Sequence, residues 1–253
     1  MVNNMQIWIL TFNRPVALNR LISALGNQGT RVNILSNHPD LKLTEENTKY
    51  LNNYIINTLN FEESNSWCAR SWNTILMKAF VQTDEVVCIQ DDTMVGNNFC
   101  QWLNHYKQSY DFIWGPAGDQ FFYLKKHILK NAGYWDERYI GCYCGDADWM
   151  KRVFMTNDPN RLSVVDTHDW GFVHNDIGVR NVINTHAKNA DPNYENQHEE
   201  LERKASGTVV CSQTHFKNKW GRYLNGTGPV NQQDERFIQE IDWYPWFTRK
   251  YLQ

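Results

Sequence analysis

Blocks of apolar and polar positions along the first part of the chain predict a strand, a helix and a second strand. Residues 5–12 are rich in β-branched and aromatic side chains and predict a strand. Pro15 suits the first turn of a helix, and the apolar residues after it recur at helical spacing, at Ala17, Leu18, Leu21, Ile22 and Leu25. Residues 31–37 predict a second strand. A strand, a helix and a strand in this order form a βαβ unit, so we expect a parallel sheet.

The same pattern continues towards the carboxyl terminus. We expect helices at 41–54, 67–80, 99–106, 127–132 and 146–154, and strands at 54–59, 85–90, 121–124, 162–165 and 171–174. The polar residues 184–208 predict either one charged helix at 195–204 or a mobile flap. Acidic residues near its amino end favour the helix that begins at Asp146. The alternation of strands and helices predicts an α/β protein, a single domain over 1–253 with a mixed, mainly parallel central sheet flanked by helices.

One stretch carries candidate chemistry. Four apolar residues, 86–89, lead through Gln90 into Asp91 and Asp92, which predicts a buried strand that ends at two carboxylates. Ligands of open α/β sheets bind at the carboxyl ends of the strands. Adjacent carboxylates repel each other, and a divalent cation such as Mg²⁺ or Mn²⁺ removes that repulsion. The alternative is a strand followed by a solvated acidic turn.

Composition narrows the class of protein. The chain has 253 residues, 42% of them hydrophobic, a net charge of -3, and charges of both signs mixed along its length. These values give no electrostatic case for binding nucleic acid or an anionic membrane. The six cysteines form no CxxC pair, and no apolar run approaches the length of a membrane span, so we expect a cytoplasmic protein with reduced thiols. Cys142 and Cys144 are a weaker candidate for a metal site.

Four segments in one order carry a resemblance to a known family. They are 9–15 (Ile-Leu-Thr-Phe-Asn-Arg-Pro), 89–93 (Ile-Gln-Asp-Asp-Thr), 133–138 (Gly-Tyr-Trp-Asp-Glu-Arg) with 145–148 (Gly-Asp-Ala-Asp), and 173–174 (Val-His). The chain resembles the inverting, family 2-like nucleotide-sugar glycosyltransferases of the glycosyltransferase A fold, which is Rossmann-like. The resemblance covers residues 5–178, with a loose match at 219–221. Two departures are that Gln90-Asp91-Asp92-Thr93 holds two acids where the family has a DxD motif, and that Gly145 replaces the usual Glu.

The resemblance implies a division of labour along the chain. Residues of about 1–100 would bind the nucleotide, about 101–180 would shape the acceptor and catalytic part, and 181–253 would be an extension packed on the domain. The donor would be a nucleotide-diphosphate sugar, UDP-sugar by family frequency, and the acceptor a glycan or another hydroxyl compound. Mn²⁺ or Mg²⁺ would assist departure of the nucleotide. Donor sugar, linkage and oligomeric state are not specified by the sequence.

The resemblance also implies metal and catalytic residues. Asp92 would bind the metal directly, Asp91 would hold the ribose hydroxyls or a metal-bound water, and His174 would complete the site, with His168 and His215 as alternatives. Asp146 would be the base that takes the proton of the acceptor hydroxyl. The alternative base is Asp148, and both carboxylates would otherwise cap the helix.

Further residues are assigned to substrates. The nucleotide-binding candidates, at the ends of the first two strands and on the helix at 67–80, are Thr11, Asn13, Arg14, Asn37, Asp40 and Arg70. Asn13 would otherwise cap a helix, and Arg70 would otherwise lie on the surface. On the acceptor side, Asp136 would bind sugar hydroxyls or brace its loop. Trp135 and Trp149, with Trp114, would stack on a sugar ring or pack in the core.

Three other functions use some of the same features. A sugar nucleotidyltransferase would need a glycine-rich phosphate loop after the first strand, and the residues there contain no glycine. A non-catalytic carbohydrate-binding protein would use the tryptophans without needing Asp92 or Asp146. A two-metal hydrolase would need further His and Asp ligands.

Overall fold

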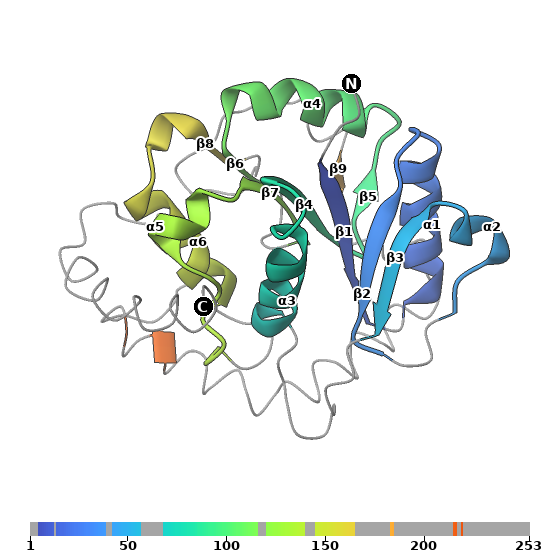
Figure 1. Ribbon diagram of the computed structural model, residues 1–253, viewed down its shortest axis with the longest axis horizontal. Coiled ribbons are helices and arrows are strands. Elements are labelled where there is room, and N and C mark those ends of the chain that lie inside the picture. The colour runs from blue at the N-terminus through green and yellow to red at the C-terminus, as the bar shows by residue number, and fades with distance from the viewer. Residues whose placement is uncertain are drawn as a thin grey trace.

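The computed structural model describes residues 5–12, 14–38, 42–56, 68–115, 120–139, 145–164, 183–184, 215–216 and 219. Within them, seven strands form one sheet in the order β3-β2-β1-β4-β7-β6-β8 (Figure 1). In that order the strands are Leu51–Ile56, Val32–Ser36, Gln6–Thr11, Glu85–Gln90, Phe121–Lys125, Phe112–Trp114 and Leu162–Val164. A second, two-stranded sheet pairs β5 (Met94–Val95) with β9 (Ile183–Asn184).

Strand direction follows from the connections. Strand β1 runs parallel to β2 and β4, and β2 runs parallel to β3. Strand β7 is antiparallel to both of its neighbours, β4 and β6, and β6 is parallel to β8. Among the described strands of this sheet, β7 therefore runs against the other six. The predicted α/β class, with a mixed and mainly parallel sheet, is confirmed.

Helices cover both faces of the sheet, so the central strands are apolar on both sides. The helices are α1 (Pro15–Gly26), α2 (Glu45–Thr48), α3 (Ala69–Ala79), α4 (Phe99–Ser109), α5 (Ile128–Ala132) and α6 (Gly145–Thr156), with a 3-10 turn at Pro159–Arg161. Alternate residues of β1 enter different cores. Trp8 and Leu10 pack with α3, α5 and α6, whereas Ile7 and Ile9 pack with α1 and α4. Figure 1 shows α3 across the middle of the sheet, with α5 and α6 beside it.

The elements differ from prediction mainly after β2. The helix predicted over 41–54 is wrong: four residues form α2, and β3 begins at Leu51. Residues 52–54 are exposed on this edge strand, so their polar composition resembled that of a surface helix, and pairing with β2 decides the structure. The strand predicted at 171–174 and the helix at 195–204 lie outside the described residues. Among the described helices, none has the length and apolar content needed to cross a lipid bilayer.

Candidate functional site

The two adjacent carboxylates lie where the central strand ends. Asp91 and Asp92 follow the last residue of β4, and the Asp91 amide donates a hydrogen bond to the carbonyl of Leu10 on β1 at 3.1 Å. Both aspartates are buried, with 3% and 2% of their surface exposed. A solvated acidic turn is therefore not what the structure shows. The pair is held inside the protein at the carboxyl edge of the parallel strands.

Asp91 is braced by the end of β1. Its Oδ2 atom accepts hydrogen bonds from the Thr11 hydroxyl at 2.6 Å and from the Phe12 amide at 3.2 Å, and its Oδ1 atom lies 3.2 Å from Arg14 Nη1. The pKa of Asp91 is raised to about 6. Burial is the largest cause and the Asp92 charge acts in the same direction, whereas the Arg14 charge and the Thr11 hydroxyl lower the pKa. These contacts fix Asp91 in place.

Arg14 joins the two aspartates. Its Nη1 atom lies 2.9 Å from Asp92 Oδ2 as well as 3.2 Å from Asp91 Oδ1, and the residue is 8% exposed. The sequence assigned Thr11 and Arg14 to the nucleotide. The structure places both at the predicted strand end, where they also hold the acidic pair. A guanidinium group here offsets the repulsion between two buried carboxylates.

A divalent cation fits the chemistry of this pair in part. Carboxylate oxygens are the ligands that Mg²⁺ and Mn²⁺ take, and Asp92 is the better ligand because both oxygens of Asp91 already accept protein hydrogen bonds. Across the residues that the structure describes, no group of three or more His, Cys, Asp or Glu side chains is placed to hold a metal ion. His174, the predicted third ligand, lies outside them, as does His168.

The other predicted nucleotide residues lie around the same edge or outside the described chain. The Asn37 amide continues the ladder to the Thr11 carbonyl at 3.0 Å, and its Nδ2 atom donates to the Ser71 hydroxyl at 2.8 Å. This contact ties the end of β2 to the first turn of α3. Arg70, half-buried, is in that same turn. Asn13 and Asp40 lie outside the described residues.

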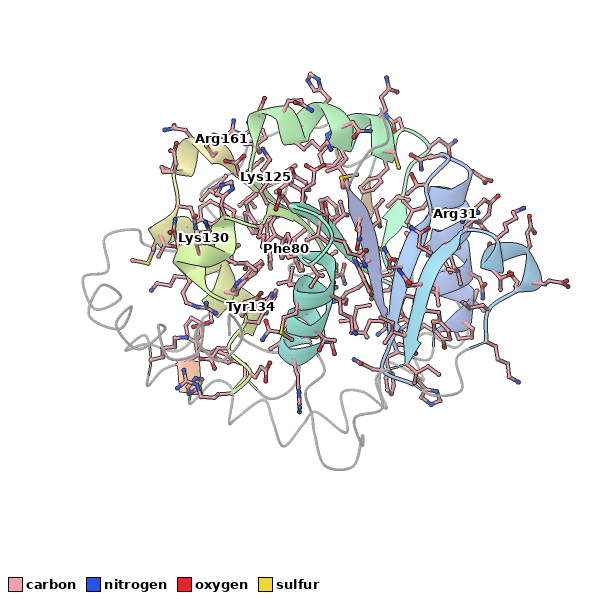
Figure 2. The ribbon with its side chains drawn as sticks, in the orientation of Figure 1. Arg31, Phe80, Lys125, Lys130, Tyr134 and Arg161 are labelled. Carbon is pink, nitrogen blue, oxygen red and sulfur yellow. The ribbon has the colours of Figure 1, made fainter. Side chains whose placement is uncertain are left out.

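Helix α3 also holds the loop at 133–139. Asn73 donates from Nδ2 to the Trp135 carbonyl at 2.9 Å and to Glu137 Oε1 at 3.0 Å, and its Oδ1 atom accepts from the Trp135 amide at 2.8 Å. Since α3 starts beside Asn37 at the carboxyl edge of the sheet, this clamp brings the predicted acceptor loop to that edge. Figure 2 shows Tyr134 of this loop on the lower side, away from Lys125 and Arg161.

Asp136 lies within this loop and is fully buried. Its carboxylate accepts two side-chain hydrogen bonds from Arg138, at 2.8 and 2.6 Å, and lies 3.3 Å from His215 Nε2 and 3.2 Å from Lys219 Nζ. Burial alone would raise the pKa of Asp136, but the hydrogen bonds from His215 and Arg138 and the charge of Lys219 hold it below its usual range. Asp136 was predicted either to bind sugar hydroxyls or to brace its loop, and these contacts are of the bracing kind.

Asp148 is the second buried centre of this ionic cluster. It accepts from Arg152 Nε at 3.0 Å and from the Tyr139 hydroxyl at 3.2 Å, and it also pairs with Lys219. The residue has no exposed surface. A base must reach the proton that it removes. The alternative assignment of Asp148 as the base is therefore corrected, because its carboxylate is enclosed by cations of the protein.

Asp146, two residues earlier, differs from Asp148. It is half-buried in the first turn of α6. Burial raises the pKa of Asp146, the backbone amides of Ala147 and of Asp146 itself oppose that effect, and the Asp148 charge adds to it. A carboxylate with a raised pKa is a better proton acceptor at neutral pH. Of the two candidate bases, Asp146 keeps the accessibility that the role needs.

Of the two roles predicted for the tryptophans, stacking on a sugar ring or packing in the core, the structure shows core packing. Trp114, Trp135 and Trp149 are 3%, 1% and 0% exposed. The rings of Trp135 and Trp149 stack on each other with centroids 4.7 Å apart, and Trp149 Nε1 donates to the Gly133 carbonyl at 3.0 Å. These rings fill the core between the sheet and α6, so they present no face to a sugar.

Sequence reasoning missed several residues that shape this site. Arg152 stands four positions after Asp148, which is a helical ion-pair spacing and was a usable indication. Asn73 interrupts the buried face of α3 with a polar side chain. The contacts of Tyr139 and Lys219 with Asp148 follow no local sequence pattern, because they join different segments of the chain.

Comparison with known proteins identifies similar folds. No family model and no curated protein sequence matches the chain. Among solved structures, the catalytic domain of Drosophila β1,4-galactosyltransferase 7, in complex with xylobiose, is 14% identical with a TM-score of 0.43, over 72% of this chain and 70% of that one. Glucosyl-3-phosphoglycerate synthase from Mycobacterium tuberculosis, in complex with Mn²⁺, UDP and phosphoglyceric acid, is 12% identical with a TM-score of 0.41, over 64% and 68%. Both likenesses are distant, and at these identities and TM-scores neither match assigns a function or a residue to this chain.

Proposed function

We propose that the protein is a metal-dependent, inverting glycosyltransferase that moves a sugar from a nucleotide-diphosphate sugar, UDP-sugar in the first instance, to a hydroxyl of a glycan or similar acceptor. The observation that carries the proposal is the buried pair of Asp91 and Asp92 at the carboxyl end of β4, held by Thr11 at the end of β1 and by Arg14 directly before α1. In α/β sheets this edge is where nucleotides bind.

The residues divide into holding and reacting groups. Asp92 would hold the cation, which supplies Lewis-acid stabilisation of the leaving diphosphate. Thr11 at the end of β1 and Arg14 at the start of α1 fix the acidic pair. Asn37 and Arg70, at the ends of β2 and α3, border the same edge and are proposed to contact the nucleotide.

Asp146 is proposed as the base. Its carboxylate would take the proton of the acceptor hydroxyl as the hydroxyl oxygen bonds to the anomeric carbon. The bond from that carbon to the diphosphate oxygen breaks in the same displacement, and the nucleoside diphosphate leaves with the electron pair. One displacement by one base inverts the anomeric centre. The raised pKa of Asp146 supports this role.

The test is a thermal-shift screen of UDP, GDP, dTDP and CDP, each with and without Mn²⁺. A ligand that binds the native state raises the melting temperature by mass action. We expect one nucleotide to stabilise the protein strongly only with metal, and Asp92→Asn to lose that effect. No shift with any nucleotide, in protein shown to be folded, would refute the proposal.

A second variant separates an enzyme from a binding protein. Asp146→Asn should keep the nucleotide-dependent shift and lose release of nucleoside diphosphate from the donor sugar. Retained turnover in this variant would remove Asp146 from the mechanism. The non-catalytic alternative is less favoured, because Trp114, Trp135 and Trp149, the three described tryptophans that were candidates for sugar stacking, are buried in the core.

A further inference from the structure

Lys219 comes from the carboxyl-terminal part of the chain and lies between two segments of the candidate site. Its Nζ atom is 3.2 Å from Asp136 Oδ2, in the loop at 133–139, and pairs with Asp148 Oδ1, in the first turn of α6. The Lys219 side chain is 5% exposed, and both carboxylates are fully buried. The ammonium group therefore adds a charged link to the direct hydrogen bonds between these two elements, which run from the Tyr139 hydroxyl to Asp148 and from Trp149 Nε1 to the Gly133 carbonyl.

The neighbours of Lys219 strengthen this junction. His215 Nε2 lies 3.3 Å from Asp136 Oδ2, and its ring meets the edge of the Tyr139 ring at a centroid distance of 4.7 Å. Lys219 Nζ lies 5.6 Å from the centre of the same Tyr139 ring. The Phe216 ring packs against the same Tyr139 ring, with the two ring centroids 6.4 Å apart. The carboxyl-terminal residues thus contact the loop through a carboxylate and an aromatic ring.

The arginine ion pairs of Asp136 and Asp148 each stay within one segment, although Arg152 Nη1 also donates a hydrogen bond to the Tyr134 carbonyl of the loop at 2.9 Å. Arg138 pairs with Asp136 from two residues away in the same loop, and Arg152 pairs with Asp148 from one turn further along α6. Each carboxylate thus has a guanidinium partner from its own segment. Among the described ion pairs, Lys219 is the cation shared by the two segments.

We propose that Lys219 is a positioning residue for Asp146: by joining Asp136 to Asp148 it fixes the acceptor loop against the first turn of α6. The inference rests on the proposed function, because the place of Asp146 matters only if it is the base. Asp146 precedes Asp148 by two residues, about 3 Å of helical rise. A displacement of Asp148 is therefore transmitted to Asp146, and a misplacement of about 1 Å costs up to about 100-fold in rate.

The competing explanation is that Lys219 only neutralises buried charge. In that case its removal would weaken the fold but leave the turnover of the folded protein unchanged. The two explanations differ in kcat, in the exchange of backbone amides near the site, and in whether arginine substitutes for lysine.

The experiment compares the full chain with Lys219→Met, Lys219→Arg and the control Lys125→Met. Lys125 pairs with Asp111 at 2.7 Å at the opposite edge of the sheet and is more exposed than Lys219, so its loss removes a lysine ion pair away from the site and controls for the change of side chain. Release of nucleoside diphosphate from UDP-, GDP- and dTDP-sugars with Mn²⁺, as the sugar is transferred to the hydroxyl of an added glycan or to water, gives kcat and KM, well below each melting temperature. Hydrogen exchange is followed in parallel over residues 133–139 and 145–149.

For Lys219→Met we expect kcat to fall about 10- to 100-fold with the donor KM within about twofold, because the proposed nucleotide and metal residues Arg14, Asp91 and Asp92 follow β1 and β4 and belong neither to the loop at 133–139 nor to α6. Exchange should become faster in 133–139 and 145–149 while β1 and β4 keep their protection. Lys219→Arg should recover most of the loss, and Lys125→Met should match the parent protein. If Lys219→Met does not fold, Lys219→Gln replaces it with the same expectations.

The contrary results are separable. An active parent protein with unchanged kcat or unchanged exchange in Lys219→Met overturns the positioning role alone, as does an arginine variant no better than methionine. A folded parent protein that releases nucleoside diphosphate from none of the donors overturns the proposed function, and the positioning role with it.

Discussion

Replacing Asn73 with alanine should destabilise the protein by about 4 kcal/mol, although no sequence motif includes this residue. Its side chain accepts a hydrogen bond from the Trp135 amide at 2.8 Å and donates one to the Trp135 carbonyl at 2.9 Å. Asn73 is fully buried and Trp135 is 1% exposed. Alanine removes the partner of two buried backbone groups, and each loss costs about 1–3 kcal/mol. At this chain length, that corresponds to a fall in melting temperature of roughly 10 °C.

The assay is urea unfolding followed by far-UV circular dichroism, with the free energy extrapolated linearly to water. The matched control is Asn131→Ala, also a helical asparagine, which is exposed and makes one exposed hydrogen bond to Asn157 at 3.2 Å. Its cost should stay within about 0.5 kcal/mol. Both variants gain the same helix propensity from alanine, so their difference isolates the buried clamp. Equal stabilities of the two variants would refute the reasoning.

Two further predictions concern the carboxylates. Asp148→Asn should lower the free energy of unfolding by about 3–5 kcal/mol, because it leaves the buried cations around residue 148 uncompensated. Asp146→Asn, at a half-buried position, should lower it by less than about 1 kcal/mol and abolish turnover. Melting curves and donor turnover check both variants, and a reversed order of stability would contradict the assignment. Because the pKa of Asp91 is about 6 in the native state and 3.8 in model compounds, its contribution to stability is present below about pH 4 and is lost as the pH rises through 6, by about 3 kcal/mol. Unfolding free energies measured from pH 4 to 8 should show this loss of stability in the parent protein but not in Asp91→Asn. Thr11→Val removes a hydrogen bond to the charged form of Asp91, so in this variant the loss should extend to higher pH. Identical pH dependence of the parent protein and Asp91→Asn would refute the prediction.

The candidate site shows where local pattern is informative and where it is not. The apolar run of β4 placed Asp91 and Asp92 at the edge of the sheet, because a strand with both faces buried must be apolar throughout. Asp146 and Asp148 share a residue type and one helical turn, and the local feature that separates them is Arg152, four residues after Asp148. The rest of their difference comes from Lys219 and Tyr139, which approach Asp148 from elsewhere in the chain.

Aromatic content was similarly ambiguous. The chain has eleven tryptophans, and local sequence does not distinguish a tryptophan that packs in the core from one that stacks on a sugar at the surface. Burial of Trp135 and Trp149 follows from the packing of α6 against the sheet, which involves residues of β6 and β7. The edge strand β3 shows a different ambiguity. Its exposed polar residues resemble a surface helix in sequence, and they form a strand because they pair with β2.

By itself the sequence determined the βαβ beginning, the central strand with its terminal carboxylates and the mainly parallel α/β class. These features depend on the spacing of apolar residues within one element, and burial imposes that spacing locally. Tertiary structure alone decided that β7 lies antiparallel between β4 and β6, that Arg14 bridges the acidic pair, and that Lys219 joins the acceptor loop to α6. Each of these depends on contacts between residues distant in the chain, for which no local period exists.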